Sequence, residues 1–131
     1  MKHKFNIISL FFLVTFLFGE NNILFDSING HLKQYKQNIS NNDLSIEQGI
    51  LQLRLKGRRT NHKSLSLLGF YSIGKQLQKH SIHIKKIKIN IQYEMKETQQ
   101  VTFTASKELV MNLAQGSINP KQFMNRIEQL Q

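Results

Sequence analysis

The sequence predicts an α+β domain, with a small three-stranded, mostly antiparallel sheet and helices packed on one of its faces. Two kinds of periodicity predict this class. Apolar residues recur every three or four positions over 23–39 and near the C-terminus, which is typical of amphipathic helices. Apolar and polar residues alternate over 51–56, 87–95 and 101–105, which is typical of strands. The expected order of elements is α-β-α-β-β-α-α.

An apolar segment precedes the predicted domain. Lys2 and Lys4 give the chain a basic start, and the 12 residues from Ile7 to Phe18 are almost all apolar before Gly19 ends the run. A basic start, a short apolar run and a small residue at its end are typical of a secretory signal peptide. A membrane-spanning helix needs about 20 apolar residues, so this run is short for an anchor.

We therefore expect residues 1–19 to be a cleaved signal peptide and residues 20–131 to form a single domain. This predicts a periplasmic or secreted protein with no transmembrane span after cleavage. An uncleaved anchor and a native core helix are the alternative interpretations of the same segment.

The first predicted elements are a helix at 23–39 and a strand at 51–56. The helix would bury one stripe of apolar residues, namely Leu24, Phe25, Ile28, Leu32, Tyr35 and Ile39. In the strand, three leucines alternate with Gln52, Arg54 and Lys56, so one face is apolar and the other is cationic. A polar loop follows at 57–64.

The second half of the chain predicts a helix, a hairpin and two further helices. Asn61 or Ser64 would cap a helix that runs to about residue 79. The alternating segments 87–95 and 101–105 would pair as an antiparallel hairpin. Ser106 would cap a helix ending before Gly116, and Asn119 would cap a last helix that reaches Leu130.

Positive charge is concentrated in one segment. The formal net charge is +10, and the segment from Gln48 to Tyr93 holds ten Lys and Arg residues but no Asp or Glu. A basic field of this kind attracts polyanions. The alternative is a charged surface that serves solubility alone.

The candidate anion-binding residues come from this segment: Arg54, Lys56, Arg58, Arg59, Lys63, Lys86 and Lys88. Since the protein is expected outside the cytoplasm, the expected partner is an anionic component of the cell envelope or an acidic protein surface. Extracellular nucleic acid remains an alternative, but Tyr93 and Phe103 share the apolar side of their strands, so the pattern favours phosphate contact without base stacking. A different class of function is an assembly or chaperone-like subunit, which would bind a polypeptide through its N-terminal amphipathic helix or an open sheet edge.

The loop at 57–64 partly matches the phosphate loop of nucleotide hydrolases, G-x-x-x-x-G-K-[ST]. Gly57, Lys63 and Ser64 are in register, but His62 stands where the motif requires its second glycine. No aspartate follows Asp43, so the magnesium-holding acid of these enzymes is also missing. The loop is therefore interpreted as a simple anion site before a helix N-terminus, or as a solvated connection.

Catalytic and metal-binding patterns are weak. The chain has no cysteine, which excludes thiol catalysis, disulfides and cysteine metal ligands. No acidic residue lies within ten positions of His80 or His83, and no nucleophile–base motif is present. We expect no catalytic residues, no metal and no cofactor, and hence a binding protein.

Overall fold

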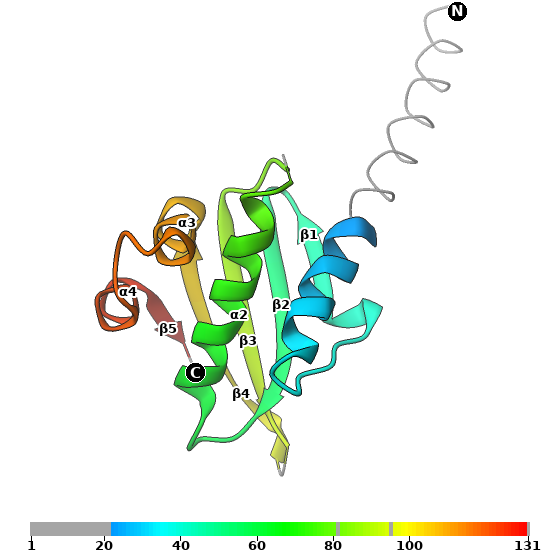
Figure 1. Cartoon of the computed structure of the whole chain (residues 1–131). Coiled ribbons are helices and arrows are strands. Elements are labelled where there is room, and N and C mark those ends of the chain that lie inside the picture. Colours follow the sequence, from blue (N-terminus) through cyan, green and yellow to red (C-terminus); the bar gives the residue numbers. More distant parts are fainter. Residues whose placement is uncertain (1–21, 81, 95, 131) are drawn as a thin grey trace, which may run out of the picture.

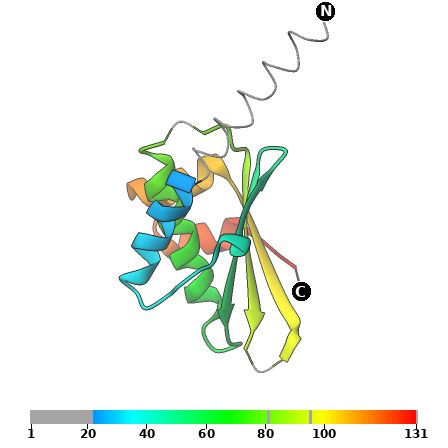
Figure 2. The ribbon, with the colours of Figure 1, turned by 90° about the vertical axis from the view of Figure 1, so that its right-hand side faces the viewer.

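The computed structural model describes residues 22–80, 82–94 and 96–130, with side chains left out at 96–98. In this part of the chain a five-stranded mixed sheet has helices on one face, and its other face is left uncovered (Figures 1 and 2). The expected signal peptide at 1–19 lies outside the described residues, so it stays a prediction.

The α+β class is confirmed, but the predicted three-stranded, mostly antiparallel sheet and its order of elements are wrong. The strands lie in the order β1-β2-β3-β4-β5, and β2 and β3 are parallel while the other pairs are antiparallel. After an N-terminal helix at 22–33, the elements are η1 (Asn41–Asp43), β1 (Leu44–Glu47), β2 (Ile50–Gly57), α2 (His62–Leu77), β3 (Lys86–Tyr93), β4 (Lys96–Ser106), α3 (Lys107–Gln115), α4 (Pro120–Arg126) and β5 (Glu128–Leu130).

The first missed strand, β1, forms a tight hairpin with β2. Gln48 and Gly49 connect the two strands, and both have positive φ (53° and 79°). Two consecutive residues with positive φ form the turn type that matches the twist of a two-residue hairpin. The sequence does not predict this turn, because Asn or Asp, rather than Gln, is the usual residue before the glycine.

The second missed strand, β5, replaces the end of the predicted last helix. Helix α4 ends at Arg126, and Glu128–Leu130 pairs antiparallel with Thr102–Thr104 of β4. The last residues could continue the helix or pair with the edge of β4. Pairing is favoured because the edge offers backbone hydrogen bonds, whereas the helical periodicity extends over only a few residues. Phe123 remains on the buried side of α4 as predicted.

The N-terminal helix is shorter than predicted and packs on its own domain. Leu24, Ile28 and Leu32 are fully buried. The helix ends in a Schellman motif, in which the Gln37 amide donates to the Leu32 carbonyl (3.1 Å) and Lys36 has φ 62°. A glycine usually takes this left-handed position. Because Lys36 stands there instead, the sequence does not predict that the helix ends at this point.

The core lies between the sheet and the helix layer. Each strand of the β2–β3–β4 group turns alternate side chains toward the helices, and these are almost fully buried: Leu51, Leu53, Leu55, Ile87, Ile89, Ile91, Val101, Phe103 and Ala105. The helices contribute Phe70 and Phe123, whose rings meet edge-on at 5.1 Å. The apolar residues of the alternating segments therefore face the core, and the polar residues between them lie on the other face of the sheet.

Helices α2 and α3 approach closely at Gly74. A Cβ atom at this position would lie 2.7 Å from the Cβ of Ala114 and 2.9 Å from the carbonyl oxygen of Val110. Backbone cannot give way as a flexible side chain can, so this contact requires glycine. Gly30 in the N-terminal helix is the opposite case, because nothing lies within 4 Å of a Cβ there.

We predict that Gly74→Ala lowers the free energy of unfolding by about 1–3 kcal/mol, since the added methyl group forces α2 and α3 apart. Gly30→Ala is the matched control. It should raise the free energy of unfolding by about 0.5–1 kcal/mol, because alanine restricts the unfolded chain without a clash. Urea unfolding followed by circular dichroism measures both changes, and equal effects of the two substitutions would contradict the close approach.

Candidate functional site

The uncovered face of the sheet carries polar side chains from three adjacent strands. We call it the open face; its members on β2–β4 are Ile50, Gln52, Arg54, Lys56, Lys86, Lys88, Asn90, Gln92, Gln100, Thr102, Thr104 and Ser106. Figure 2 shows this side of the sheet edge-on, with the helices gathered on the opposite side. Only Ile50 in this set is apolar.

The register of β2 and β3 arranges four cations in one row. Lys86 lies beside Ile50, Lys88 beside Gln52, Arg54 beside Asn90, and Lys56 beside Gln92. One cation therefore stands at each successive level of the open face, two residues or about 6.6 Å apart. We call the row Lys86, Lys88, Arg54 and Lys56 the basic stripe. Sequence analysis predicted its members, and the parallel pairing places them together.

Arg54 is held in place by the segment before β1. Its Nε lies 3.1 Å from Asp43 Oδ1, and its Nη2 donates to the Asn42 carbonyl oxygen (3.1 Å). The other carboxylate oxygen of Asp43 accepts from the Ser40 amide (2.9 Å). Arg54 is thus positioned and partly neutralised. In the part of the chain that the structure describes, the three lysines of the stripe form no ion pair.

The remaining predicted residues lie beyond the end of β2. Arg58 faces Glu94 with its Nε 3.8 Å from Oε2, in a solvent-exposed pair. Arg59 donates from Nη2 to Gln99 Oε1 (3.0 Å), and its Cζ lies 5.8 Å from the centre of the Tyr93 ring. These side chains and Thr60 border a hollow of about 440 Å³. Arg58 and Arg59 therefore follow Lys56 in the chain but are engaged with Glu94, Gln99 and Tyr93 at the end of the sheet.

The loop at 57–64 is closed by its own hydrogen bonds. Asn61 Oδ1 accepts from the Arg58 amide (2.8 Å) and so does not cap α2, and Ser64 Oγ donates to the Asn61 carbonyl (3.0 Å). His62, in the position of the motif's second glycine, begins α2 with its ring 6.0 Å from that of Phe103. Lys63 is exposed on the first turn of α2, away from the basic stripe.

Sequence reasoning missed the uncharged residues beside the stripe. Asn90 is 6% exposed, and its Nδ2 donates to Gln100 Oε1 (3.0 Å) and to Thr102 Oγ1 (2.9 Å). A hollow of about 450 Å³ lies over them, lined by Asn42, Asp43, Ser45, Glu47, Gln52, Arg54, Asn90, Gln92, Gln100 and Thr102. The alternation of 87–95 and 101–105 placed Asn90 and Thr102 on the polar sides of their strands, but only the sheet shows that the two lie side by side.

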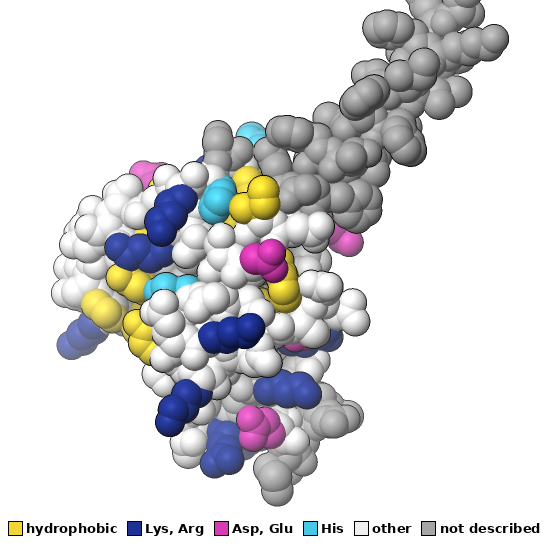
Figure 3. Space-filling view, turned by 45° about the vertical axis from the view of Figure 1, so that its right-hand side comes forward, with side chains coloured by type: hydrophobic (Ala, Val, Ile, Leu, Met, Phe, Trp, Pro, Cys, Tyr) yellow, Lys and Arg dark blue, Asp and Glu magenta, His cyan; other side chains and the backbone are white. Residues whose placement is uncertain are grey.

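Within the described residues the helix side also carries cations, among them Lys75 in the last turn of α2 and Lys79 just after it. In the oblique view of Figure 3, Lys and Arg side chains are spread among uncharged ones. Within residues 22–80, 82–94 and 96–130, no three His, Cys, Asp or Glu side chains are grouped to hold a metal ion. No helix in that range is long and apolar enough to span a membrane. The open face is therefore the best candidate site.

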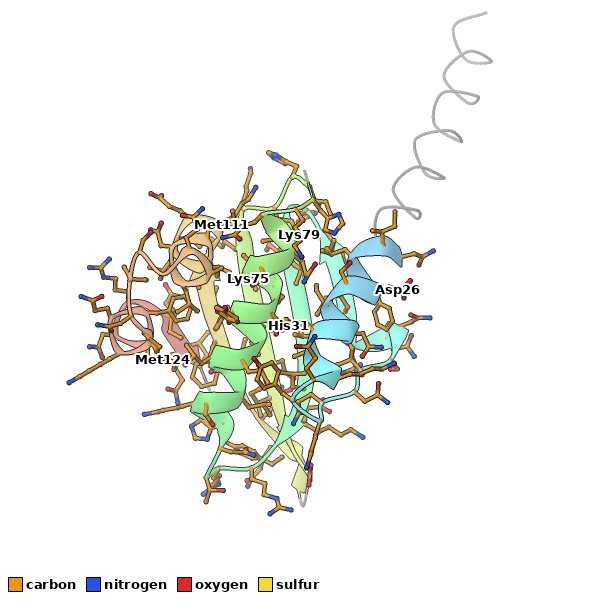
Figure 4. The ribbon with its side chains drawn as sticks, in the orientation of Figure 1. Asp26, His31, Lys75, Lys79, Met111 and Met124 are labelled. Carbon is orange, nitrogen blue, oxygen red and sulfur yellow. The ribbon has the colours of Figure 1, made fainter. Side chains whose placement is uncertain are left out.

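A second polar cluster joins the N-terminal helix to α2. His31 Nδ1 lies 2.7 Å from Ser72 Oγ, and the His31 ring packs near those of Tyr35 and Tyr71 (Figure 4). Burial lowers the pKa of His31 below its ordinary value of 6.5, and the nearby cations Lys75 and Lys79 lower it further. Ser72 is fully buried, so it cannot serve as a nucleophile for a substrate in solution.

Comparison with models of protein families, with curated proteins and with solved structures found no significant match to this chain. The function is therefore inferred from the geometry of the open face.

We predict that the free energy of unfolding decreases as the pH falls below 6.5, the ordinary pKa of histidine. In that range the unfolded chain binds a proton that folded His31 does not, so protonation favours unfolding. Urea unfolding between pH 8 and about pH 4 measures the effect. His31→Gln should reduce the loss at acid pH, whereas His83→Gln, at an exposed position, should not. The same loss in both variants would contradict this assignment.

Proposed function

We propose that this protein is an exported basic binding protein of the cell envelope, periplasmic or secreted, that captures an anionic partner electrostatically on its open face. The proposed anion-binding residues are Arg54, Lys56, Arg58, Arg59, Lys63, Lys86 and Lys88. The basic stripe makes the principal contacts, Arg58 and Arg59 extend it, and Lys63 adds to the field from the start of α2.

The observation that carries this proposal is the parallel register of β2 and β3. It places Lys86 and Lys88 of one strand and Arg54 and Lys56 of the other at successive levels of the same face, although at least 30 residues separate the two pairs along the chain. Lysines close together on an uncovered face repel one another unless an anion lies across them. A bound anion would reduce this repulsion, which lowers the free energy of the complex.

Arg54 gives the stripe a fixed point. Its hydrogen bonds to Asp43 and to the Asn42 carbonyl hold the guanidinium at one orientation, while the neighbouring lysines form no ion pair with the side chains that the structure describes. A partner therefore meets one ordered donor group and several adaptable point charges. This arrangement favours electrostatic capture of an extended partner over recognition of one small anion.

Export is supported by the sequence of 1–19 and is compatible with where the folded core starts. Leu24, the first buried residue of the described core, follows Gly19 by five residues. Cleavage after Gly19 would therefore leave the packed part of the N-terminal helix intact.

If the protein is instead an assembly or chaperone-like subunit, fewer of its surfaces could bind a polypeptide than the sequence suggested. The apolar stripe of the N-terminal helix is occupied by the protein's own core, which leaves Ile23 (55% exposed) and Tyr35 (52% exposed) outside it. The sheet edge at β5, where Leu130 is 65% exposed, is the feature that favours a polypeptide partner. Salt-resistant recovery of a single protein on the immobilised chain would support this alternative over anion capture.

We predict that the protein binds long-chain polyphosphate, and that its affinity falls by about tenfold or more between about 50 and about 200 mM NaCl. The triple variant Lys56→Gln, Lys86→Gln, Lys88→Gln should lose most of this affinity and most of the salt dependence. Fluorescence anisotropy with labelled polyphosphate measures both quantities.

The matched control removes three charges from exposed positions in the helix layer, with Lys33→Gln, Lys121→Gln and Arg126→Gln. It has the same net charge as the stripe variant, so a general effect of net charge would weaken both equally. Binding that persists unchanged at high salt, or equal losses in the two triple variants, would contradict capture by the stripe.

We predict that the protein recovered from the producing cells begins at Glu20, because a signal peptidase cleaves after Gly19. N-terminal sequencing of the protein from the extracytoplasmic fraction measures this. A chain that retains Met1 and stays with the membranes would instead indicate an anchor.

A further inference from the structure

We infer that the anionic partner is a linear acidic polysaccharide, whose charges lie along the basic stripe and whose hydroxyl groups bind the uncharged polar side chains beside it. This inference rests on the proposed function, because it names the class of polyanion that the open face takes.

The uncharged side chains form a second row next to the stripe. Asn90, Gln92, Gln100, Thr102 and Thr104 come from β3 and β4, and we call them the amide–hydroxyl row. The register places Asn90 beside Thr102, Gln92 beside Gln100, and Thr104 beside Lys88 of the stripe. The open face therefore offers charges on one side and neutral hydrogen-bonding groups on the other.

Internal hydrogen bonds hold part of this row in place and leave donors available. Because Gln100 Oε1 and Thr102 Oγ1 accept from Asn90 Nδ2, the amide group of Gln100 and the hydroxyl proton of Thr102 are free to donate. Asn90 also lines the hollow over the sheet, and its Oδ1 has no hydrogen-bond partner among the described residues. A sugar hydroxyl both donates and accepts, so it matches such a mixed set.

The acidic residues around the hollow indicate a partner whose charges are spaced apart. Asp43 and Glu47 both line it. Asp43 is engaged by Arg54, whereas Glu47 forms no ion pair among the described residues. A polymer that presents little besides its charges along its length, such as polyphosphate, would be repelled by Glu47. A polysaccharide can place an uncharged hydroxyl there instead, and the carboxylate accepts its hydrogen bond.

Nucleic acid fits the open face less well. Binding of single strands relies on aromatic side chains on which the bases stack. The aromatic residues of β3 and β4, Tyr93 and Phe103, are directed into the core, where they are 9% and 0% exposed. The open-face positions of β2–β4 hold no aromatic residue.

A lipid surface also fits less well, because membrane binding needs apolar side chains to insert beside the cations. The open face has Ile50 on β2, which is half-buried, and Leu130 on β5. Strands β3 and β4 separate the two, so they do not form one apolar patch.

The test compares four anionic probes that differ in hydroxyl content. The protein without its proposed signal peptide, residues 20–131, is titrated, at constant low salt, with polygalacturonate, long-chain polyphosphate, oligo(dT) and phosphatidylglycerol vesicles. We expect polygalacturonate to bind about tenfold more tightly than the other three, a difference of about 1.4 kcal/mol.

The double variant Gln92→Leu, Thr104→Val removes hydrogen-bonding groups from the row and leaves every cation in place. It should lose about tenfold in affinity for polygalacturonate, with little change for polyphosphate. The control Gln78→Leu, Gln115→Leu removes two exposed amides from the helix layer and should keep the preference for polygalacturonate. Unchanged thermal unfolding shows that each variant is folded.

The outcomes separate this inference from the proposed function. If all polyanions bind equally and the double variant has no effect, electrostatic capture stands and the polysaccharide inference is wrong. Tighter binding of oligo(dT) or of vesicles also overturns it, in favour of nucleic acid or lipid. If no probe binds in a salt-dependent way, the proposed function fails as well.

Discussion

Strands β2 and β3 pair in parallel because α2 carries the chain along the sheet and returns it to the same end, and the other features of the molecule depend on this pairing. Alternate side chains of both strands enter the core beneath α2, so the intervening ones emerge together on the opposite face. The same register of β2 and β3 thus places apolar residues in the core and the cations of the basic stripe on the opposite face. A shift of one residue would bury the lysines, and the packing of Ile87, Ile89 and Ile91 opposes it.

Two arginines of the acid-free segment contact acidic residues from outside it. Asp43 precedes the segment and pairs with Arg54, whereas Glu94 follows it and faces Arg58. Both pairs lie at least partly in water, so each contributes little to stability. The effect of the Asp43 pair is on position, because it orders Arg54 near the middle of the stripe, whereas the lysines of the stripe are left to a partner.

The alternating segments allowed much of the open face to be predicted. The side of each strand on which Arg54, Lys56, Lys86 and Lys88 lie follows from local alternation, which does not depend on the rest of the fold. The amide–hydroxyl row was not predicted as a site, because a polar strand face is expected wherever solvent touches a sheet. Its significance comes from the hydrogen bonds of Asn90 and from the hollow over it, which involve four strands and the segment before β1.

By itself, the sequence determined the α+β class, the position of the two central strands, the apolar side of the N-terminal helix and the concentration of positive charge. These properties are local, since periodicity and composition act over a few residues. Tertiary structure decided that β2 and β3 are neighbours, and that β1 and β5 complete a five-stranded sheet. Strands of three or four residues are stable only when a longer strand supplies the hydrogen bonds, so the sheet as a whole, rather than their own sequence, specifies them.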